Sequence, residues 1–383
     1  MFKPDKAFEI GPIRPPSEAT SLLIRVNRNC PWNRCTFCPV YKGQRFSVRE
    51  REEVLADIER AASIAGEIRQ LSWRHGLGGA VTEGLFQRIA SSDGSSESVS
   101  HVARWMYYGA ESVFLQDANA LIARVDDLVG ILEAIRRAFP SVKRVTSYSR
   151  SHTVSKRSVE DLARLKAAGL DRVHIGLESG SDAVLGFVEK GVTAKRQIEA
   201  GRLIKSAGLE LSEYIMPGLG GRRWTKEHAT ETARVLNAID PDFIRIRSLA
   251  ISPGTPLAER EKAGEIEPLS GVETIEELRL LIENLEGITS RIVSDHMLNL
   301  LEEVQGRLPE DKEAMIASID RFLALSDDEK DLFQLGRRLG VFRTPDDLER
   351  SPHAGRIRAL MDDVREKHGG VEAGIQEIMK QFI

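Results

Sequence analysis

All three cysteines of this 383-residue chain lie within nine consecutive positions, in the run Cys30-Pro-Trp-Asn-Arg-Cys35-Thr-Phe-Cys38. We call this run the cysteine segment. Thiolates grouped so closely are soft ligands, suited to zinc or to an iron–sulfur cluster. An odd number of cysteines argues against a framework of disulfides. The cysteine segment therefore predicts a metal site rather than a covalent cross-link.

The spacing of the cysteines, C-x4-C-x2-C, supplies three thiolates where an iron–sulfur cluster commonly has four. A cluster held by three thiolates keeps one iron open for a substrate or cofactor, whereas a simple electron carrier would hold every iron. Structural zinc is the alternative, and it needs a fourth ligand at short range. The nearest histidines, His75 and His101, are distant in the sequence and do not form an H-x3-5-H pair.

Composition limits the partners that the chain can have. The formal net charge of −4 gives no overall positive field for a nucleic acid, so we expect a small-molecule substrate instead. The sequence contains no run of eighteen apolar residues and no apolar signal region at its N-terminus. These features predict a cytoplasmic protein with no membrane partner.

Strand-like and helix-like segments alternate through the first two thirds of the chain. Six strands are expected, at 21–26, in the apolar run that ends at Leu115, at 144–149, at 173–177, in the run that ends at Met216, and at 242–251. Such alternation predicts a parallel sheet. Right-handed crossovers bring the carboxyl ends of its strands to one edge, where the chemistry of barrel folds collects. The cysteine segment follows the first strand and is expected at this edge.

The expected fold class is therefore α/β, a partial (βα)6 TIM-like barrel with parallel strands. We expect an N-terminal extension over 1–20, the barrel domain over 21–264 and a helical C-terminal region over 265–383, in which one helix covers 290–305. The serine-rich stretch 91–100 is expected to form a surface loop.

Five motifs occur in order on the expected strands. They are the cysteine segment, Val113–Asp117, His174–Ser181, Tyr214–Gly221 and Ile251–Leu257. On these motifs the chain, from about residue 20 to 260, resembles the radical S-adenosylmethionine (radical SAM) superfamily. Within it, the chain looks most like the branch of the elongator-type and oxygen-independent coproporphyrinogen oxidase-like enzymes.

Two departures from the family pattern concern the expected site. The common family spacing is C-x3-C-x2-C, so the loop between Cys30 and Cys35 is one residue longer here. The family's Gly-Gly-Glu-Pro type motif is replaced by Gln116-Asp117-Ala-Asn119, which keeps one carboxylate.

The resemblance implies that Cys30, Cys35 and Cys38 bind an oxygen-sensitive [4Fe–4S] cluster whose fourth iron is chelated by S-adenosylmethionine (SAM). It implies reductive cleavage of SAM to a 5′-deoxyadenosyl radical that abstracts hydrogen from an unidentified substrate. The electron would come from an external donor such as flavodoxin or ferredoxin. A zinc-binding structural protein and a degenerate member that binds a cofactor such as haem without cleaving SAM are the alternatives.

The resemblance also implies which residues contact SAM: Phe37, Gln116, Asp117, Ser147, Tyr148, Glu178, Ser179, Lys190 and Glu213. Some of them have a structural alternative. Phe37 could pack on the core, Lys190 could be a solvated surface residue, and Glu213 could form a salt bridge. The polar residues after the second strand, including Asn119, could cap the strand end.

Two further groups of polar residues are candidates for the substrate side. Arg245 and Arg247 alternate along the last expected strand, and they face either an anionic substrate or a salt-bridge partner such as Glu213. Asp295, His296 and Asn299 would share one face of the expected helix over 290–305. They are the candidate catalytic residues, with a purely structural role as the alternative.

Overall fold

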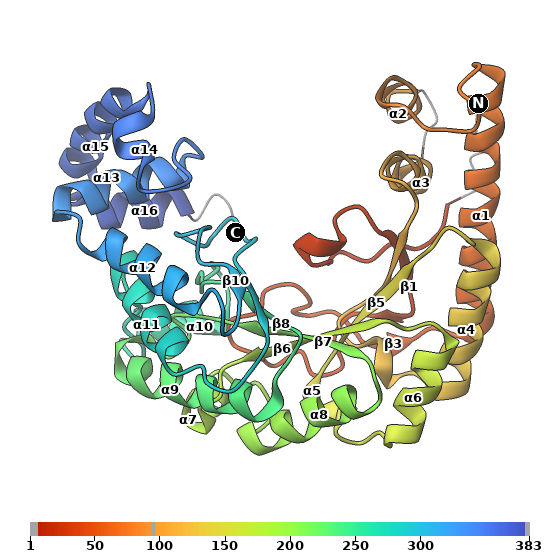
Figure 1. Cartoon of the computed structure of the whole chain (residues 1–383), viewed down its shortest axis with the longest axis horizontal. Helices are drawn as coiled ribbons and strands as arrows, with labels where there is room; N and C mark the ends of the chain where they lie inside the picture. The colour runs from red at the N-terminus through yellow and green to blue at the C-terminus, as the bar shows by residue number, and fades with distance from the viewer. Residues whose placement is uncertain (1–6, 93–95, 380–383) are drawn as a thin grey trace. The chain divides into compact units, whose positions relative to one another are not determined.

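The computed structural model of the chain describes residues 7–92 and 96–379 (Figure 1). Six strands of its main sheet alternate with helices along the chain: β1 (Leu22–Arg25), β4 (Ser112–Gln116), β5 (Arg144–Ser149), β6 (Arg172–Glu178), β7 (Glu210–Ile215) and β8 (Phe243–Ile246). They lie in sequence order within the sheet. The pairs β1–β4, β4–β5, β5–β6 and β7–β8 are parallel. The expected α/β fold, a partial (βα)6 barrel, is confirmed.

Two more strands extend the sheet beyond β8. Strand β9 (Arg291–Val293) runs parallel to β8, with Ile292 opposite Ile244. Strand β10 (Gly306–Arg307) is antiparallel to β9. The helix expected over 290–305 is therefore wrong. Pairing with the edge of β8 satisfies backbone groups that a helix here would leave exposed on that strand.

The chain divides into two compact units, and we describe each by itself. The first unit comprises the residues up to Pro31, Val40–Ile175 and Arg202–Leu211, and the second comprises Trp32–Pro39, Gly176–Gly201 and the chain from Ser212 onward. The chain passes from one unit to the other within β6 and β7. The boundaries expected at residues 20 and 264 stay a prediction.

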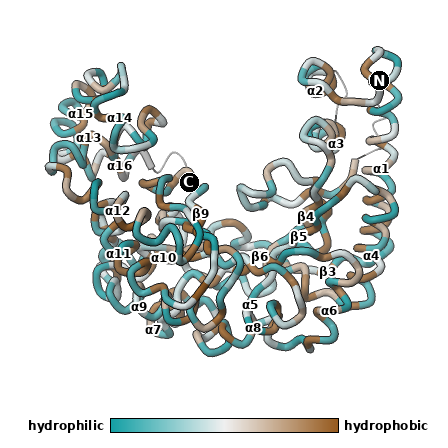
Figure 2. Tube along the Cα trace, in the orientation of Figure 1, coloured by the Kyte–Doolittle hydropathy of each residue, from teal (hydrophilic) through white to brown (hydrophobic). Residues whose placement is uncertain are grey.

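The first unit holds β1, β4 and β5 with their helices. These are α1 (Arg51–Arg74), α2 (Glu83–Ala90), α3 (Glu97–Tyr107), α4 (Val125–Ala138), α5 (Ser151–Val154) and α6 (Val159–Ala168), with the short 3₁₀ helices η1 (Pro16–Glu18) and η2 (Ala120–Ile122). A small ribbon pairs β2 (Asn27–Arg28) with β3 (Ser47–Val48). Helix α4 packs against α1 and α6. In Figure 2 apolar residues mark the middle of β4, where Val113, Phe114 and Leu115 are buried.

The serine-rich stretch 91–100 is only partly described. Helix α3 begins inside it, with the Ser96 hydroxyl accepting a hydrogen bond from the Val99 amide, as a helix N-cap does. Residues 97–100 are therefore helical rather than part of a surface loop, and residues 93–95 lie outside the described residues.

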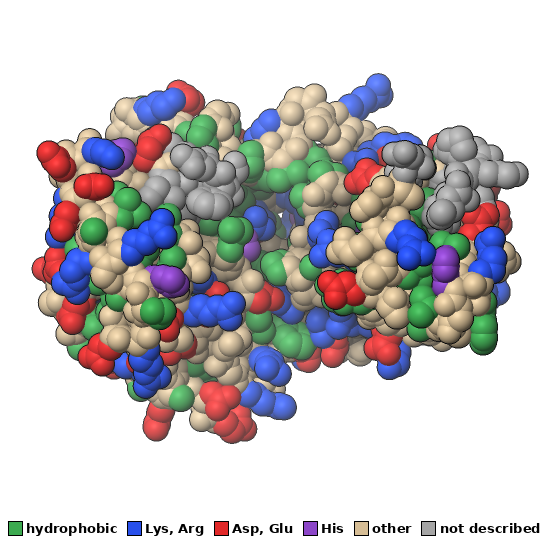
Figure 3. Space-filling model, turned by 90° about the horizontal axis from the view of Figure 1, so that it is seen from above, with side chains coloured by type: hydrophobic (Ala, Val, Ile, Leu, Met, Phe, Trp, Pro, Cys, Tyr) green, Lys and Arg blue, Asp and Glu red, His purple; other side chains and the backbone are tan. Residues whose placement is uncertain are grey.

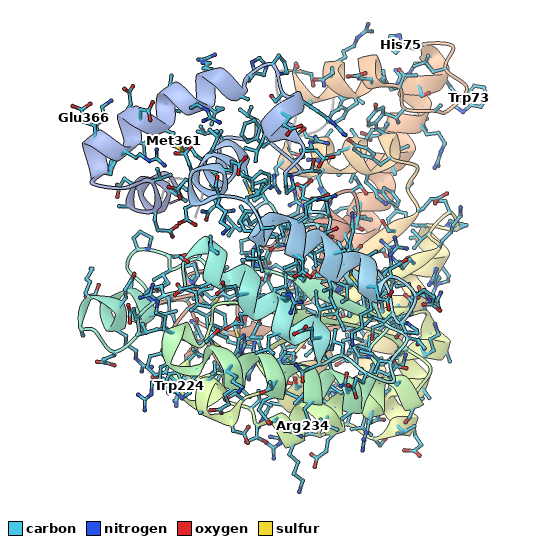
Figure 4. The ribbon with its side chains drawn as sticks, turned by 60° about the vertical axis from the view of Figure 1, so that its left-hand side comes forward. Trp73, His75, Trp224, Arg234, Met361 and Glu366 are labelled. Atoms are coloured by element: carbon cyan, nitrogen blue, oxygen red, sulfur yellow. The ribbon has the colours of Figure 1, made fainter. Side chains whose placement is uncertain are left out.

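The second unit holds β8 to β10 and the remaining helices. These are α7 (Asp182–Phe187), α9 (Gly221–Ile239), α10 (Pro256–Lys262), α11 (Gly271–Glu283), α12 (Lys312–Leu323), α13 (Asp327–Arg338), α14 (Asp347–Arg350), α15 (Ala354–His368) and α16 (Val371–Met379); α8 (Ala194–Ser206) is shared between the units. Helices α13, α15 and α16 pack on one another. Figure 4 labels Met361 of α15, which is buried, and Glu366 of the same helix, which is exposed.

Within residues 7–92 and 96–379, no helix combines the length and the apolar character needed to cross a bilayer.

Candidate functional site

The cysteine segment follows the β2 strand. Cys30, Cys35 and Cys38 are all thiols of intermediate exposure. The amide of Cys38 donates to the carbonyl of Cys35 at 3.3 Å, which closes a tight turn between the last two cysteines. Among the described residues, no three side chains of the His, Cys, Asp and Glu types surround a position for a single metal ion.

Trp32 and Thr36 hold the tip of the cysteine segment in the second unit. The Trp32 indole donates to the Glu189 carbonyl at 2.7 Å. The Thr36 amide donates to the Val188 carbonyl at 3.0 Å. The indole also packs on Gly191, whose φ of 71° and closeness to the ring leave no room for a side chain. The longer loop between Cys30 and Cys35 thus carries a tryptophan that docks after α7, a role the sequence reasoning missed.

The stems of the cysteine segment lie in the first unit, where they meet the Asp117 carboxylate. Asp117 is fully buried. Its Oδ1 accepts from the Tyr41 hydroxyl at 2.7 Å, and its Oδ2 accepts from the Asn29 amide at 3.3 Å. Arg25 adds an ion pair to Oδ2, with Nη2 at 2.5 Å. The carboxylate expected to bind SAM is therefore engaged by protein donors.

Gln116 and Asn119 are also engaged by the protein. The Gln116 side chain accepts from the Gly11 amide at 2.8 Å and donates to the Ile13 carbonyl at 2.6 Å. Asn119 accepts from the Ser149 hydroxyl and from the Arg150 amide, both at 3.0 Å. Gln116 thus tethers the N-terminal extension, and Asn119 caps a strand end. The Gln116 amide is satisfied by the protein, as buried polar groups generally are, and its contact with SAM stays a prediction.

Ser147 and Tyr148 lie on β5 in the first unit. Ser147 is fully buried, and its hydroxyl has no hydrogen-bond partner among the described residues. The Tyr148 ring packs edge-on against Phe114 at 5.1 Å and against His174 at 5.9 Å between ring centroids. Their contact with SAM stays a prediction.

Four predicted residues come together in the second unit, at the carboxyl ends of β6 and β7. Lys190 Nζ donates to Glu178 Oε1 at 2.8 Å, and it lies 5.8 Å from the centre of the Phe37 ring. Glu178 has a left-handed backbone, with φ of 61°. Lys190 is therefore no solvated surface residue. We call Phe37, Glu178, Lys190 and Glu213 the carboxyl-edge cluster.

Glu213 is the buried acid of the carboxyl-edge cluster. Its side chain is 1% exposed, and its Oε2 has no hydrogen-bond partner among the described residues. Burial raises the pKa of Glu213 well above its ordinary value; the negative charge of Glu178 raises it further, and Lys190 opposes both. The fold therefore favours the protonated form of Glu213 relative to an exposed glutamate.

Ser179 and Phe37 have partners inside the second unit. The Ser179 hydroxyl lies 2.8 Å from Nδ1 of His228 on α9 and accepts from the Ser181 amide at 3.1 Å. Through these contacts Ser179 links the end of β6 to its neighbouring helices.

Phe37 packs against the apolar cluster of Val184, Val188, Met216 and Leu219. Trp224 borders the same cluster, and Figure 4 labels it near the start of α9.

The candidate catalytic residues lie on the loop after β9, not on a helix. Asp295 accepts from Arg245 Nη1 at 2.6 Å. Of the two alternatives for Arg245, a salt bridge is therefore present, and its partner is Asp295 rather than the suggested Glu213. Asn299 accepts from the Ser248 amide at 3.1 Å and is a structural link.

His296 lies beside Arg247. Burial, with the charge of Arg247 nearby, lowers the pKa of His296 to about 4. Arg247 itself is exposed.

Comparison with known proteins gives one family and several partial relatives. The model of the radical SAM superfamily matches residues 24–236. The tRNA uridine(34) acetyltransferase of Methanocaldococcus jannaschii is 29% identical over 118 residues, which is 30% of this chain and 22% of that protein. The biotin synthase of Geobacter sulfurreducens is 28% identical over 177 residues, 45% of this chain and 50% of that protein.

The chain thus spans half the length of these relatives or less. Among solved structures, coproporphyrinogen III oxidase from Escherichia coli superposes with a TM-score of 0.44 at 11% identity, covering 95% of this chain and 90% of that one.

Proposed function

The chain belongs to the radical SAM superfamily, whose model matches more than half of it, and we propose that it is a radical SAM enzyme. Its cofactors are those of the family, a [4Fe–4S] cluster and SAM. The local match to a tRNA uridine(34) acetyltransferase agrees with the elongator-type branch expected from the motifs.

The observation that carries the proposal is the carboxyl-edge cluster. A buried carboxyl with an oxygen lacking a protein partner is costly unless a ligand supplies one. Glu213 is such a group. Lys190 beside it carries an ammonium that is paired with Glu178, and Phe37 offers an aromatic face. SAM carries a carboxylate, ribose hydroxyls and an adenine ring, so the residues present fit it.

The residues of this chain have separate roles in the proposal. The thiolates of Cys30, Cys35 and Cys38 hold the iron. Lys190 would orient the SAM carboxylate, and the buried Glu213 carboxyl would form a hydrogen bond with a ribose hydroxyl. When bound, the cluster and SAM supply a carbon radical that removes hydrogen from the substrate; the protein contributes orientation and exclusion of water.

Anaerobic reconstitution tests the proposal against its two alternatives. We expect about four irons and four sulfides per chain, lost in Cys35→Ala and kept in the neighbouring exposed-loop variant Val40→Ala. Reductant should release 5′-deoxyadenosine from SAM. Stoichiometric zinc without iron would support the structural-zinc alternative. A reducible cluster that never yields 5′-deoxyadenosine, even with cell extract, would favour the degenerate member.

We further propose a small-molecule substrate that carries an anionic group, with Arg247 as its cation. Asp295 already neutralises Arg245, whereas Arg247 is exposed beside an uncharged His296. On the face in Figure 3, acidic and basic side chains are interspersed, unlike the continuous basic surface that nucleic acids favour.

A tRNA substrate is the second candidate, because relatives with matching segments are tRNA-modifying by name. Turnover-dependent 5′-deoxyadenosine formation with total tRNA, compared with small-molecule extract fractions, separates the two. The same proposal includes an external electron donor such as flavodoxin or ferredoxin. It also includes a cytoplasmic location.

A further inference from the structure

The Asp117 carboxylate joins three segments of the first unit. It directly follows β4 and is fully buried. Oδ1 accepts from the Tyr41 hydroxyl at 2.7 Å. Oδ2 accepts from Arg25 Nε at 2.8 Å and from the Asn29 amide at 3.3 Å. Both oxygens of this carboxylate are therefore occupied by donors from the protein.

Two of these donors flank the cysteine segment. Asn29 immediately precedes Cys30, and Tyr41 lies three residues after Cys38. One carboxylate thus fixes the distance between the two stems of the loop. Asn29 has a left-handed backbone, with φ of 67°, and its side-chain amide donates to the Arg45 carbonyl at 2.6 Å. The stem that precedes Cys30 is tied at two points.

The surroundings keep the Tyr41 hydroxyl protonated and cover the carboxylate. Burial, with the Asp117 charge, raises the pKa of the Tyr41 hydroxyl, so it remains a donor. Gly11 packs so closely that a methyl group on it would lie 2.6 Å from Asp117 Oδ1. The N-terminal extension therefore covers the carboxylate.

We propose that Asp117 is a positioning residue that holds the stems of the cysteine segment in place for the cluster, and that it does not contact SAM. This inference rests on the proposed function, since it assigns the segment to cluster binding. Its physical basis is preorganisation: a loop whose ends are already fixed loses less conformational freedom when it takes up its ligand.

Tyr41→Phe tests the proposal, because it deletes one donor to Asp117 and keeps the buried ring. Tyr107→Phe, on α3 of the same unit, is the matched control. In the full-length protein without metal, we expect the thiols of Tyr41→Phe to react with Ellman's reagent at least threefold faster than those of the control. After anaerobic reconstitution, iron retention against a chelator should fall by a similar factor.

SAM affinity separates positioning from direct contact. Titration calorimetry on cluster-loaded Tyr41→Phe and Asp117→Asn should give a Kd for SAM, per loaded cluster, within threefold of wild type. A tenfold weaker Kd with unchanged thiol reactivity would overturn the proposal and make Asp117 a SAM ligand. Equal thiol reactivity in Tyr41→Phe and Tyr107→Phe would also overturn it.

The thiol measurement does not require iron. If the wild type takes up no iron at all, the proposed function fails, while the thiol rates still decide whether Asp117 orders the loop. Circular dichroism of each variant shows whether a faster thiol rate comes from the loop or from global unfolding.

Discussion

Lys190 donates to Glu178 at 2.8 Å, and this ion pair lies directly over the backbone of Gly176. A methyl group on Gly176 would lie 2.1 Å from Glu178 Oε1 and 3.0 Å from Lys190 Nζ. Glycine is therefore required inside β6 for the pair to reach its position. Since both side chains are nearly buried, the pair is an element of the carboxyl-edge cluster rather than a surface contact.

We expect Lys190→Met to weaken SAM binding at least tenfold, because the variant removes the cation proposed for the SAM carboxylate. It also leaves Glu178 buried without its partner, which costs roughly 3 kcal/mol of stability. Titration calorimetry and urea unfolding measure the two effects. Lys195→Met, on the exposed side of α8, is the control. Equal SAM affinity in both variants would contradict the assignment of Lys190.

Gly191→Ala should displace Trp32 from its docking position. The alanine would have to adopt a φ of 71° and would place its Cβ 2.4 Å from the indole. Gly287→Ala is the matched control, because Gly287 has a φ of 67° and open space around it. Both variants should lose about 1 kcal/mol to backbone strain, but only Gly191→Ala should change the tryptophan emission and the iron content. An unchanged emission spectrum in Gly191→Ala would show that the indole does not depend on this contact.

Glu213→Gln should change how stability depends on pH. The pKa of Glu213 is raised in the folded protein, so the unfolded chain loses this proton first as the pH rises. Its stabilising effect is therefore complete below about pH 4.5 and is lost as the pH rises toward the folded pKa. Glutamine removes this loss, and the stability of the variant relative to wild type should increase with pH above 4.5. Urea unfolding of both proteins from pH 4 to 8 measures this difference in stability. If the two curves of stability against pH run parallel, the raised pKa of Glu213 in the folded protein is contradicted.

Asp295→Ala should destabilise the protein by roughly 2–4 kcal/mol. The change leaves Arg245 almost fully buried, with the Ser212 hydroxyl and the Phe243 ring beside it but without its carboxylate. A buried charge without its ion-pair partner is costly. Glu259→Ala is the control, because it breaks an exposed pair with Lys262 that is expected to contribute less than about 1 kcal/mol. Thermal or urea unfolding compares the two, and equal losses would argue that Arg245 finds another partner.

The strands and the cysteine segment could be predicted from sequence because their signals are local. The runs around Leu115 and Met216 follow glycines that end helices, and the expected strands there are present as β4 and β7. Strand β9 could not be predicted in the same way. Its three residues are too few to show the alternation of apolar and polar residues that indicates a strand. They form a strand because Ile292 pairs with Ile244 of β8.

The sequence by itself determined the parallel α/β fold, the grouping of three thiols and the family, since each depends on residues close together in the chain. The tertiary structure decided the partners of the charged and polar groups. Asp117 meets Tyr41 across 76 residues, and Arg245 meets Asp295 across 50. Residues far apart in sequence are brought together only when the strands pair. A buried carboxylate then takes whichever donor the fold places beside it, and no local pattern records that choice.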